Sequence, residues 1–131
     1  MQFFNFWMND KEKFALGSST KGLNFETLNT FELKVKESFD NGLFNIPVYL
    51  SIGTEFNSAA LSLAMPGCHI FAQHRSHALY LNFGGKPEAL RDELFGLPTG
   101  CSGGMSGSNA IQAPEANMYG HSGLMGEQIP I

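Results

Sequence analysis

The sequence predicts a mixed α/β fold, and three features support this prediction. Apolar residues recur at intervals of three and four near the start of the chain, as in one face of a helix: Phe25, Leu28, Phe31, Val35 and Phe39. Residues 68–72 form a short apolar run that is typical of a buried strand. Pro87 and Gly96 stand at the favoured first and closing positions of another helix.

The remaining elements follow from the turn residues. Gly42 is placed to end the first helix in the left-handed conformation. Residues 47–52 are predicted to be extended and to lead into a second helix, whose apolar positions are Phe56, Ala59, Ala60 and Leu63. Residues 76–83 are predicted to form one or two helical turns. Residues 97–123 are predicted to be a loop, and its unusual length suggests a function.

Composition excludes several classes of protein. Eight Lys and Arg against 12 Asp and Glu give a net charge of −4, so clustered cations for binding nucleic acid are lacking. No apolar run reaches the ~20 residues of a membrane helix, and residues 1–13 lack the features of a signal peptide. Two cysteines make no disulfide scaffold. We therefore expect a cytoplasmic protein without nucleic-acid or membrane partners.

The first candidate site is residues 73–77, directly after the predicted strand. In open α/β sheets, anionic ligands bind where a strand ends and a helix begins. Arg75 could bind a phosphate with its planar guanidinium, and His77 could move a proton near neutral pH. Alternatively, this is an exposed turn whose histidines cap a helix or contact backbone. The spacing of His69, His74 and His77 fits no zinc signature, so we expect no metal there.

The second candidate site is the glycine loop, residues 100–108. Its backbone N–H groups could form a concave nest for an anion, or the segment could be a flexible linker. It matches neither a Walker loop nor a dinucleotide-binding motif. Cys101 has no adjacent base, which argues against a nucleophile. Glu55 and Glu127 stand at predicted helix starts, where a structural role is expected.

Six segments in order resemble the alpha subunit of the thiamine-diphosphate-dependent first component of 2-oxo acid dehydrogenase complexes, of the pyruvate and acetoin type. Residues 46–55 are similar to the family's P-V-H-L-S-I-G-Q-E, and residues 74–77 to its aromatic-Arg-x-His. Residues 123–130 are similar to G-I-V-G-x-Q-x-P. The other three segments are residues 84–87, 93–96 and 100–108.

The resemblance implies a fold, cofactors and site residues. Residues 1–24 would be an N-terminal arm, and residues 25–131 the front part of a thiamine-diphosphate-binding domain that stops before the magnesium and diphosphate motif. The cofactors would be thiamine diphosphate and magnesium, with the magnesium ligands downstream of this chain. The site residues would be the catalytic His77, His74 and Arg75 beside the cofactor, and main-chain groups at Gly123 and Met125.

The resemblance also implies partners and a reaction. The partners would be a beta subunit, in a heterotetramer, and a lipoyl-bearing acyltransferase component. The reaction would be oxidative decarboxylation of a pyruvate-like 2-oxo acid, or cleavage of acetoin, with acyl transfer to a lipoyl group.

This sequence departs from the family at four positions. Gly103 and Met105 stand at the two basic positions of the family's loop, and Ala110 stands where its last His falls. Tyr49 replaces a usual His. These departures suggest an alternative function, a non-catalytic binding module derived from the family.

Overall fold

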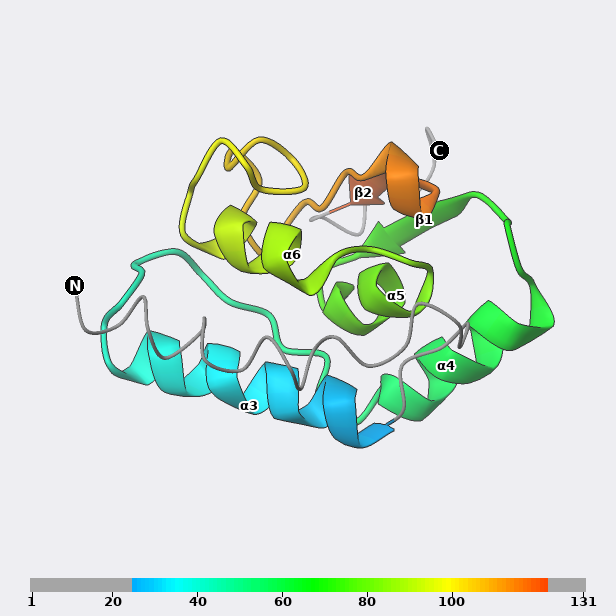
Figure 1. Cartoon of the computed structure of the whole chain (residues 1–131), viewed down its shortest axis with the longest axis horizontal. Helices are drawn as coiled ribbons and strands as arrows, with labels where there is room; N and C mark the ends of the chain where they lie inside the picture. The colour runs from blue at the N-terminus through cyan, green and yellow to red at the C-terminus, as the bar shows by residue number, and fades with distance from the viewer. Residues whose placement is uncertain (1–24, 123–131) are drawn as a thin grey trace.

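The structure is a computed structural model that describes residues 25–122 of the 131-residue chain. These residues form a mixed α/β fold, as predicted, with four α-helices, one short 3-10 helix and two strands (Figure 1). In chain order the elements are α3 (Phe25–Asp40), α4 (Glu55–Ala64), β1 (Ile70–Gln73), α5 (His77–Asn82), α6 (Pro87–Leu94), η1 (Pro114–Ala116) and β2 (Met118–Ser122). The predicted N-terminal arm and residues 123–131 lie outside the described residues.

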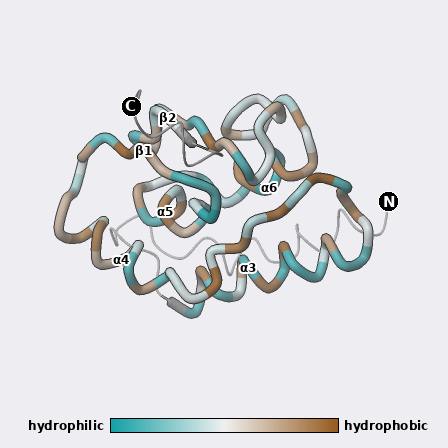
Figure 2. Tube along the Cα trace, turned by 180° about the vertical axis from the view of Figure 1, so that it is seen from behind, coloured by the Kyte–Doolittle hydropathy of each residue, from teal (hydrophilic) through white to brown (hydrophobic). Residues whose placement is uncertain are grey.

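The helices α3 and α4 run along one long side of the described part, and the sheet and the glycine loop lie on the opposite side, with α5 between them (Figure 1). The mostly hydrophobic connection from α3 to α4 runs back along α3 (Figure 2). The buried hydrophobic core joins side chains from every element except α4, and from the connecting segments: Leu28, Phe31, Val35, Phe44, Ile70, Tyr80, Leu81, Leu90, Leu94, Ile111, Ala113, Ala116 and Met118. No helix among residues 25–122 is long and apolar enough to cross a membrane.

The two strands pair in parallel, from Ile70 opposite Met118 to Gln73 opposite Ser122, with an irregularity after Ile70. The sequence predicted only β1, and the predicted loop over residues 97–123 is wrong where β2 lies. The segment of β2 reads M-Y-G-H-S, which contains a glycine and no β-branched residue. Its strand conformation comes from pairing with a distant segment, because β-propensity depends strongly on context.

Helix α3 packs largely as its apolar spacing predicts, with exceptions at Phe39, Glu32 and Ser38. Leu28, Phe31 and Val35 are buried, whereas Phe39 near the end of the helix is 43% exposed. Glu32 is also buried, at 1% exposure. Gly42 has a φ of +69°, the left-handed conformation predicted for the residue that ends this helix.

Helix α4 was predicted correctly as a helix but with the wrong buried face. Its polar residues Glu55, Ser58 and Ser62 are buried, whereas Phe56 and Leu63 are 77% and 66% exposed. The hydroxyl of Ser58 donates to the carbonyl oxygen of Thr54, the N-cap residue, and that of Ser62 donates to the carbonyl oxygen of Ala59 within the helix. Glu55 accepts a hydrogen bond from the N–H of Gly53 at 2.7 Å. Burying these groups costs little because each is hydrogen-bonded.

The last two helices agree with the sequence. Helix α5 lies within residues 76–83, as predicted, and α6 begins at Pro87. Gly96 follows α6 with a φ of +69° and ends that helix as expected. The first candidate site, residues 73–77, lies between β1 and α5, and the second, residues 100–108, follows α6.

Candidate functional site

A chain of three buried polar side chains lies at the centre of the molecule. Oε1 of Glu32, from α3, is 3.0 Å from Nδ1 of His77, at the start of α5. Nε2 of His77 is 2.8 Å from Oγ of Ser108 in the glycine loop. All three residues are at most 1% exposed. One imidazole therefore connects α3 to the glycine loop.

The surrounding contacts indicate which nitrogen of His77 carries the proton. The N–H of Tyr49 donates to Oγ of Ser108 at 2.9 Å, and Nε2 of His77 lies 2.8 Å from the same oxygen. A carboxylate only accepts, so Nδ1 of His77 carries a proton and donates it to Glu32. Both ring nitrogens of His77 therefore have a hydrogen-bond partner.

The order serine, histidine and carboxylate is that of a hydrolytic triad, but the arrangement cannot act as one. In such enzymes, the hydroxyl must reach a substrate carbonyl next to an oxyanion hole. Ser108 is 1% exposed, and its oxygen already accepts the N–H of Tyr49. The chain of hydrogen bonds therefore holds segments of the fold together.

Ser51 extends this network to the first candidate site. Its N–H donates to Oε2 of Glu32 at 3.1 Å, and its hydroxyl donates to the carbonyl oxygen of Arg75 at 2.8 Å. The same hydroxyl oxygen accepts the N–H of Ala78 at 3.3 Å. Ser51 is fully buried. It therefore fixes both sides of the turn that contains Arg75 and His77.

Arg75 combines an unusual backbone with an exposed side chain. Its φ is +67°, in the left-handed region that costs a non-glycine residue energy. The guanidinium makes no hydrogen bond or ion pair with any described residue. The binding of an anion by this exposed cation stays a prediction from the sequence.

His74 lies against Tyr49, with ring centroids 5.0 Å apart and an interplanar angle of 60°. Tyr49 is one of the positions where this sequence departs from the family it resembles, and His74 stands where an aromatic residue is usual. The rings of Tyr49 and His74, the residue that directly precedes Arg75, thus contact each other.

The glycine loop forms a nest, the first of the two alternatives left open by the sequence, but the chain's own Glu93 fills it. Oε2 of Glu93 accepts the N–H groups of Ser102 and Gly104, each at 2.8 Å. Oε1 accepts those of Ser106 and Gly107, at 2.7 and 3.0 Å. Glu93 is fully buried. The loop is therefore ordered, and these four donors are not available to an external anion.

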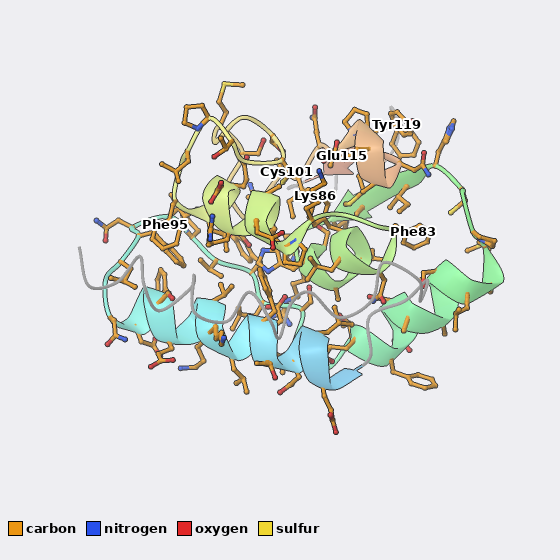
Figure 3. All side chains as sticks on the ribbon, viewed as in Figure 1. Phe83, Lys86, Phe95, Cys101, Glu115 and Tyr119 are labelled. Carbon is orange, nitrogen blue, oxygen red and sulfur yellow. The ribbon has the colours of Figure 1, made fainter. Side chains whose placement is uncertain are left out.

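Cys101 lies in the same loop and is a poor nucleophile. Burial, and then the negative charge of Glu93, raise the pKa of its thiol to about 12. Glu115 adds to this effect, and Figure 3 shows Cys101 and Glu115 labelled near one another in the upper part of the view. Burial likewise raises the pKa of the nearby Tyr80 phenol. The structure thus agrees with the interpretation of Cys101 drawn from the sequence.

Sequence reasoning missed the two carboxylates that organise these sites, Glu32 and Glu93. A signal was present in both cases. Glu32 lies four residues after Leu28, on the apolar face of its helix, and Glu93 lies three residues after Leu90. A carboxylate inside an apolar stripe is buried with the rest of the stripe and needs hydrogen-bond donors there.

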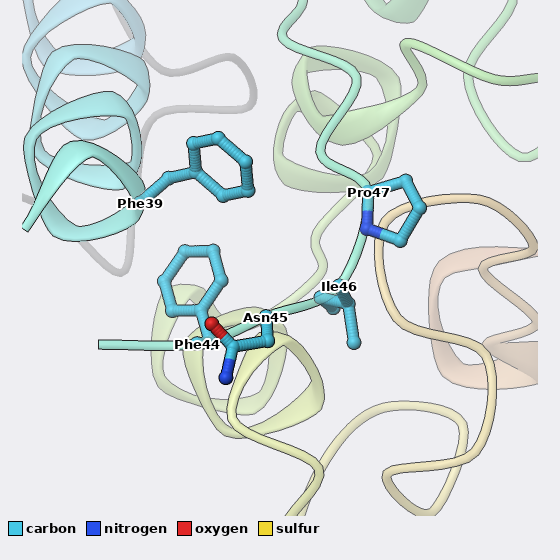
Figure 4. Close-up of a pocket in the computed structure, with 5 residues that line it drawn as sticks. All are labelled: Phe39, Phe44, Asn45, Ile46 and Pro47. Atoms are coloured by element: carbon cyan, nitrogen blue, oxygen red, sulfur yellow. The ribbon is translucent and has the colours of Figure 1, made fainter. Parts of the chain in front are cut away.

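Other candidate sites contribute less. An open cavity of about 340 Å³ lies beside the end of α3, lined by Phe39, Phe44, Asn45, Ile46 and Pro47 (Figure 4). None of these five side chains titrates. Within residues 25–122, no group of three His, Cys, Asp or Glu side chains is arranged to hold a metal ion. Gly123 and Met125, expected from the resemblance to contact a cofactor, lie outside the described residues.

Comparison with known proteins identifies relatives of this chain. No protein-family model matches it. It is 31% identical over 105 residues to the pyruvate dehydrogenase E1 component subunit alpha of Rickettsia conorii, covering 79% of this chain and 32% of the relative. It is 39% identical over 62 residues to the mitochondrial subunit alpha-2 of Arabidopsis thaliana, covering 47% and 16%. For the mitochondrial somatic form of Rattus norvegicus the identity is 29% over 107 residues, covering 81% and 27%.

The matched region of the bacterial and rat relatives covers most of this chain, whereas the chain spans about a third or less of each relative's length. The resemblance drawn from the six ordered segments is thereby confirmed. This chain is a distant homologue of the pyruvate dehydrogenase E1 alpha subunits.

Proposed function

We propose that this chain is the front part of a thiamine-diphosphate-dependent 2-oxo acid or acetoin dehydrogenase alpha subunit, and that it is catalytic only when the rest of the domain and a beta subunit are present. The observation that carries this proposal is Arg75. Its cation is exposed and without a described partner, on a left-handed turn that buried side chains hold in place. The homology to E1 alpha subunits supports the same assignment.

The described residues fit the diphosphate half of the cofactor better than they fit a metal. The Arg75 guanidinium presents paired N–H donors, which suit a diphosphate. His74, half-buried against Tyr49, would lie beside the cofactor. Magnesium would be bound by downstream residues, and Gly123 and Met125 would meet the pyrimidine ring. When bound, thiamine diphosphate supplies the carbon nucleophile that attacks a 2-keto carbonyl.

His77 has a more specific role in this proposal. The resemblance implies that it faces the reacting centre, whereas here both of its ring nitrogens are hydrogen-bonded within the protein. We propose that it acts there only after its bond to Ser108 opens to expose Nε2. Glu32 would then hold the ring in position through Nδ1.

The experiment is the substitution Arg75→Ala in the complete alpha subunit, assembled with its beta subunit and assayed for decarboxylation of pyruvate. We expect the decarboxylation activity to fall at least tenfold, because the variant needs a higher concentration of thiamine diphosphate for saturation. Unchanged activity would overturn the proposal. The 131-residue chain alone is expected to bind thiamine diphosphate weakly or not at all, and sub-micromolar, magnesium-dependent binding would contradict the assignment of the magnesium site to downstream residues.

The alternative is a non-catalytic binding module, and one observation favours it. The nest of the glycine loop is filled by Glu93, and the loop has no cation to offer, since Gly103 and Met105 occupy those positions. Under this alternative, Arg75→Ala would leave every enzymatic activity unchanged and would weaken capture of a protein partner.

The partners follow from the first proposal. A beta subunit would complete the active site, and a lipoyl-bearing acyltransferase would accept the acyl group. The cytoplasmic location predicted from composition stays a prediction, since the plant and rat relatives are named mitochondrial and the Rickettsia relative is bacterial.

A further inference from the structure

We propose that Ser51, held in place by Glu32, is a positioning residue that keeps Arg75 in the left-handed conformation needed to present its guanidinium to a phosphate-class anion. This inference rests on the proposed function, in which Arg75 meets the diphosphate. Within residues 25–122, only two non-glycine residues have a positive φ, Arg75 and Asn117. Asparagine adopts this conformation readily, whereas arginine does not. A strained arginine therefore needs a compensating contact.

Ser51 supplies that contact. Its hydroxyl donates to the carbonyl oxygen of Arg75 at 2.8 Å and accepts the N–H of Ala78 at 3.3 Å, so one oxygen spans the turn. Both bonds are to backbone atoms, and they restrain the peptide that follows Arg75.

Glu32 fixes Ser51 in turn. Its Oε2 accepts the N–H of Ser51 at 3.1 Å, while its Oε1 lies 3.0 Å from His77. Glu32 and Ser51 are at most 1% exposed, so no water competes for these bonds. The carboxylate thus determines the position of the serine, and the serine determines the backbone of the arginine.

The test measures binding of inorganic pyrophosphate to the 131-residue chain by NMR of its backbone amides and, in the chains that keep Arg75, of the Arg75 side-chain Nε–H. Four chains are compared: the wild type, Ser51→Ala, Arg75→Ala and Ser62→Ala. The last is a matched control, because it removes another buried serine hydroxyl that donates to a backbone carbonyl. Backbone scalar couplings report φ at position 75 in each chain.

We expect pyrophosphate to bind the wild type and Ser62→Ala equally, and Ser51→Ala about tenfold more weakly, with position 75 no longer left-handed. If Ser51→Ala binds as the wild type does while Arg75→Ala does not, the positioning role is overturned and the proposed function stands. If the wild type does not bind, or Arg75→Ala binds equally, the positioning role is overturned, whereas the proposed function is decided by the decarboxylation assay of the complete alpha subunit. Should Ser51→Ala fail to fold, Ser51→Cys keeps a similar volume with a weaker donor and is held to the same outcomes.

Discussion

Glu32 and His77 form a fully buried pair, with Oε1 of the carboxylate 3.0 Å from Nδ1 of the imidazole. The other oxygen of Glu32 accepts the N–H of Ser51. The substitution Glu32→Gln keeps the shape of the side chain but leaves one acceptor oxygen in place of two. Either the N–H of Ser51 or Nδ1 of His77 then loses its acceptor. We expect the free energy of unfolding to fall by about 1–3 kcal/mol, measured by urea denaturation.

The control for this change is Glu37→Gln, on the exposed side of the same helix. It should alter the free energy of unfolding by less than about 0.5 kcal/mol. Equal effects of the two substitutions would mean that the buried network contributes nothing specific to stability.

Glu93 is expected to determine the order of the glycine loop. The substitution Glu93→Gln replaces one of two acceptor oxygens with a donor that opposes backbone N–H groups. We expect a loss of about 2–4 kcal/mol in the free energy of unfolding, and faster hydrogen exchange at Ser102, Gly104, Ser106 and Gly107. Glu88→Gln, at an exposed position in the first turn of α6, should cost no more than about 1 kcal/mol and leave loop exchange unchanged.

Cys101 predicts how stability depends on pH. Its thiol has a pKa near 9 in an unfolded chain and about 12 in the folded protein, so the folded state holds this proton more tightly. The stability that this group contributes is complete below pH 9 and is lost as the pH rises from about 9 to 12. Cys101→Ala removes this contribution and should make the decline shallower. Parallel declines in denaturation curves between pH 8 and 11 would refute the assignment.

Arg75 predicts an unusual effect of glycine. Because position 75 has a φ of +67°, Arg75→Gly should be more stable than Arg75→Ala by about 1 kcal/mol in thermal or urea unfolding. At Glu37, inside α3, the order must reverse, because glycine disfavours a helix relative to alanine by about 1 kcal/mol. The same order at both positions would argue that Arg75 is not left-handed in solution.

The sequence was informative where local rules determine structure. The spacing of Phe31 and Val35, and the glycines at 42 and 96, predicted the bounds of α3 and α6 closely. Strand β2 was not predicted, because its conformation depends on pairing with β1, which is distant in the sequence. The buried face of α4 was predicted wrongly for a different reason. Its buried serine hydroxyls donate to carbonyl oxygens of the local backbone, and the hydrophobicity of the sequence does not indicate these hydrogen bonds.

For the candidate site too, the sequence indicated the local features and not the contacts between distant segments. Arg75 and His77 stood out because polar residues follow an apolar strand, and the structure places them in one turn. Ser51 and Ser108 could not be connected to them from the sequence, because those contacts join segments that are far apart in the chain. Only the family resemblance had brought these segments together.

The carboxylate inside the glycine loop also has a consequence for experiments in solution. A group tethered to its receptor acts at an effective concentration that reaches the millimolar range even for a short flexible linker, and Glu93 is held rigidly by α6. Phosphate or sulfate in a buffer therefore competes against an anion that is always present and already desolvated. Titrating such ions should leave the loop resonances unmoved, and any anion response of this chain can be read as coming from elsewhere.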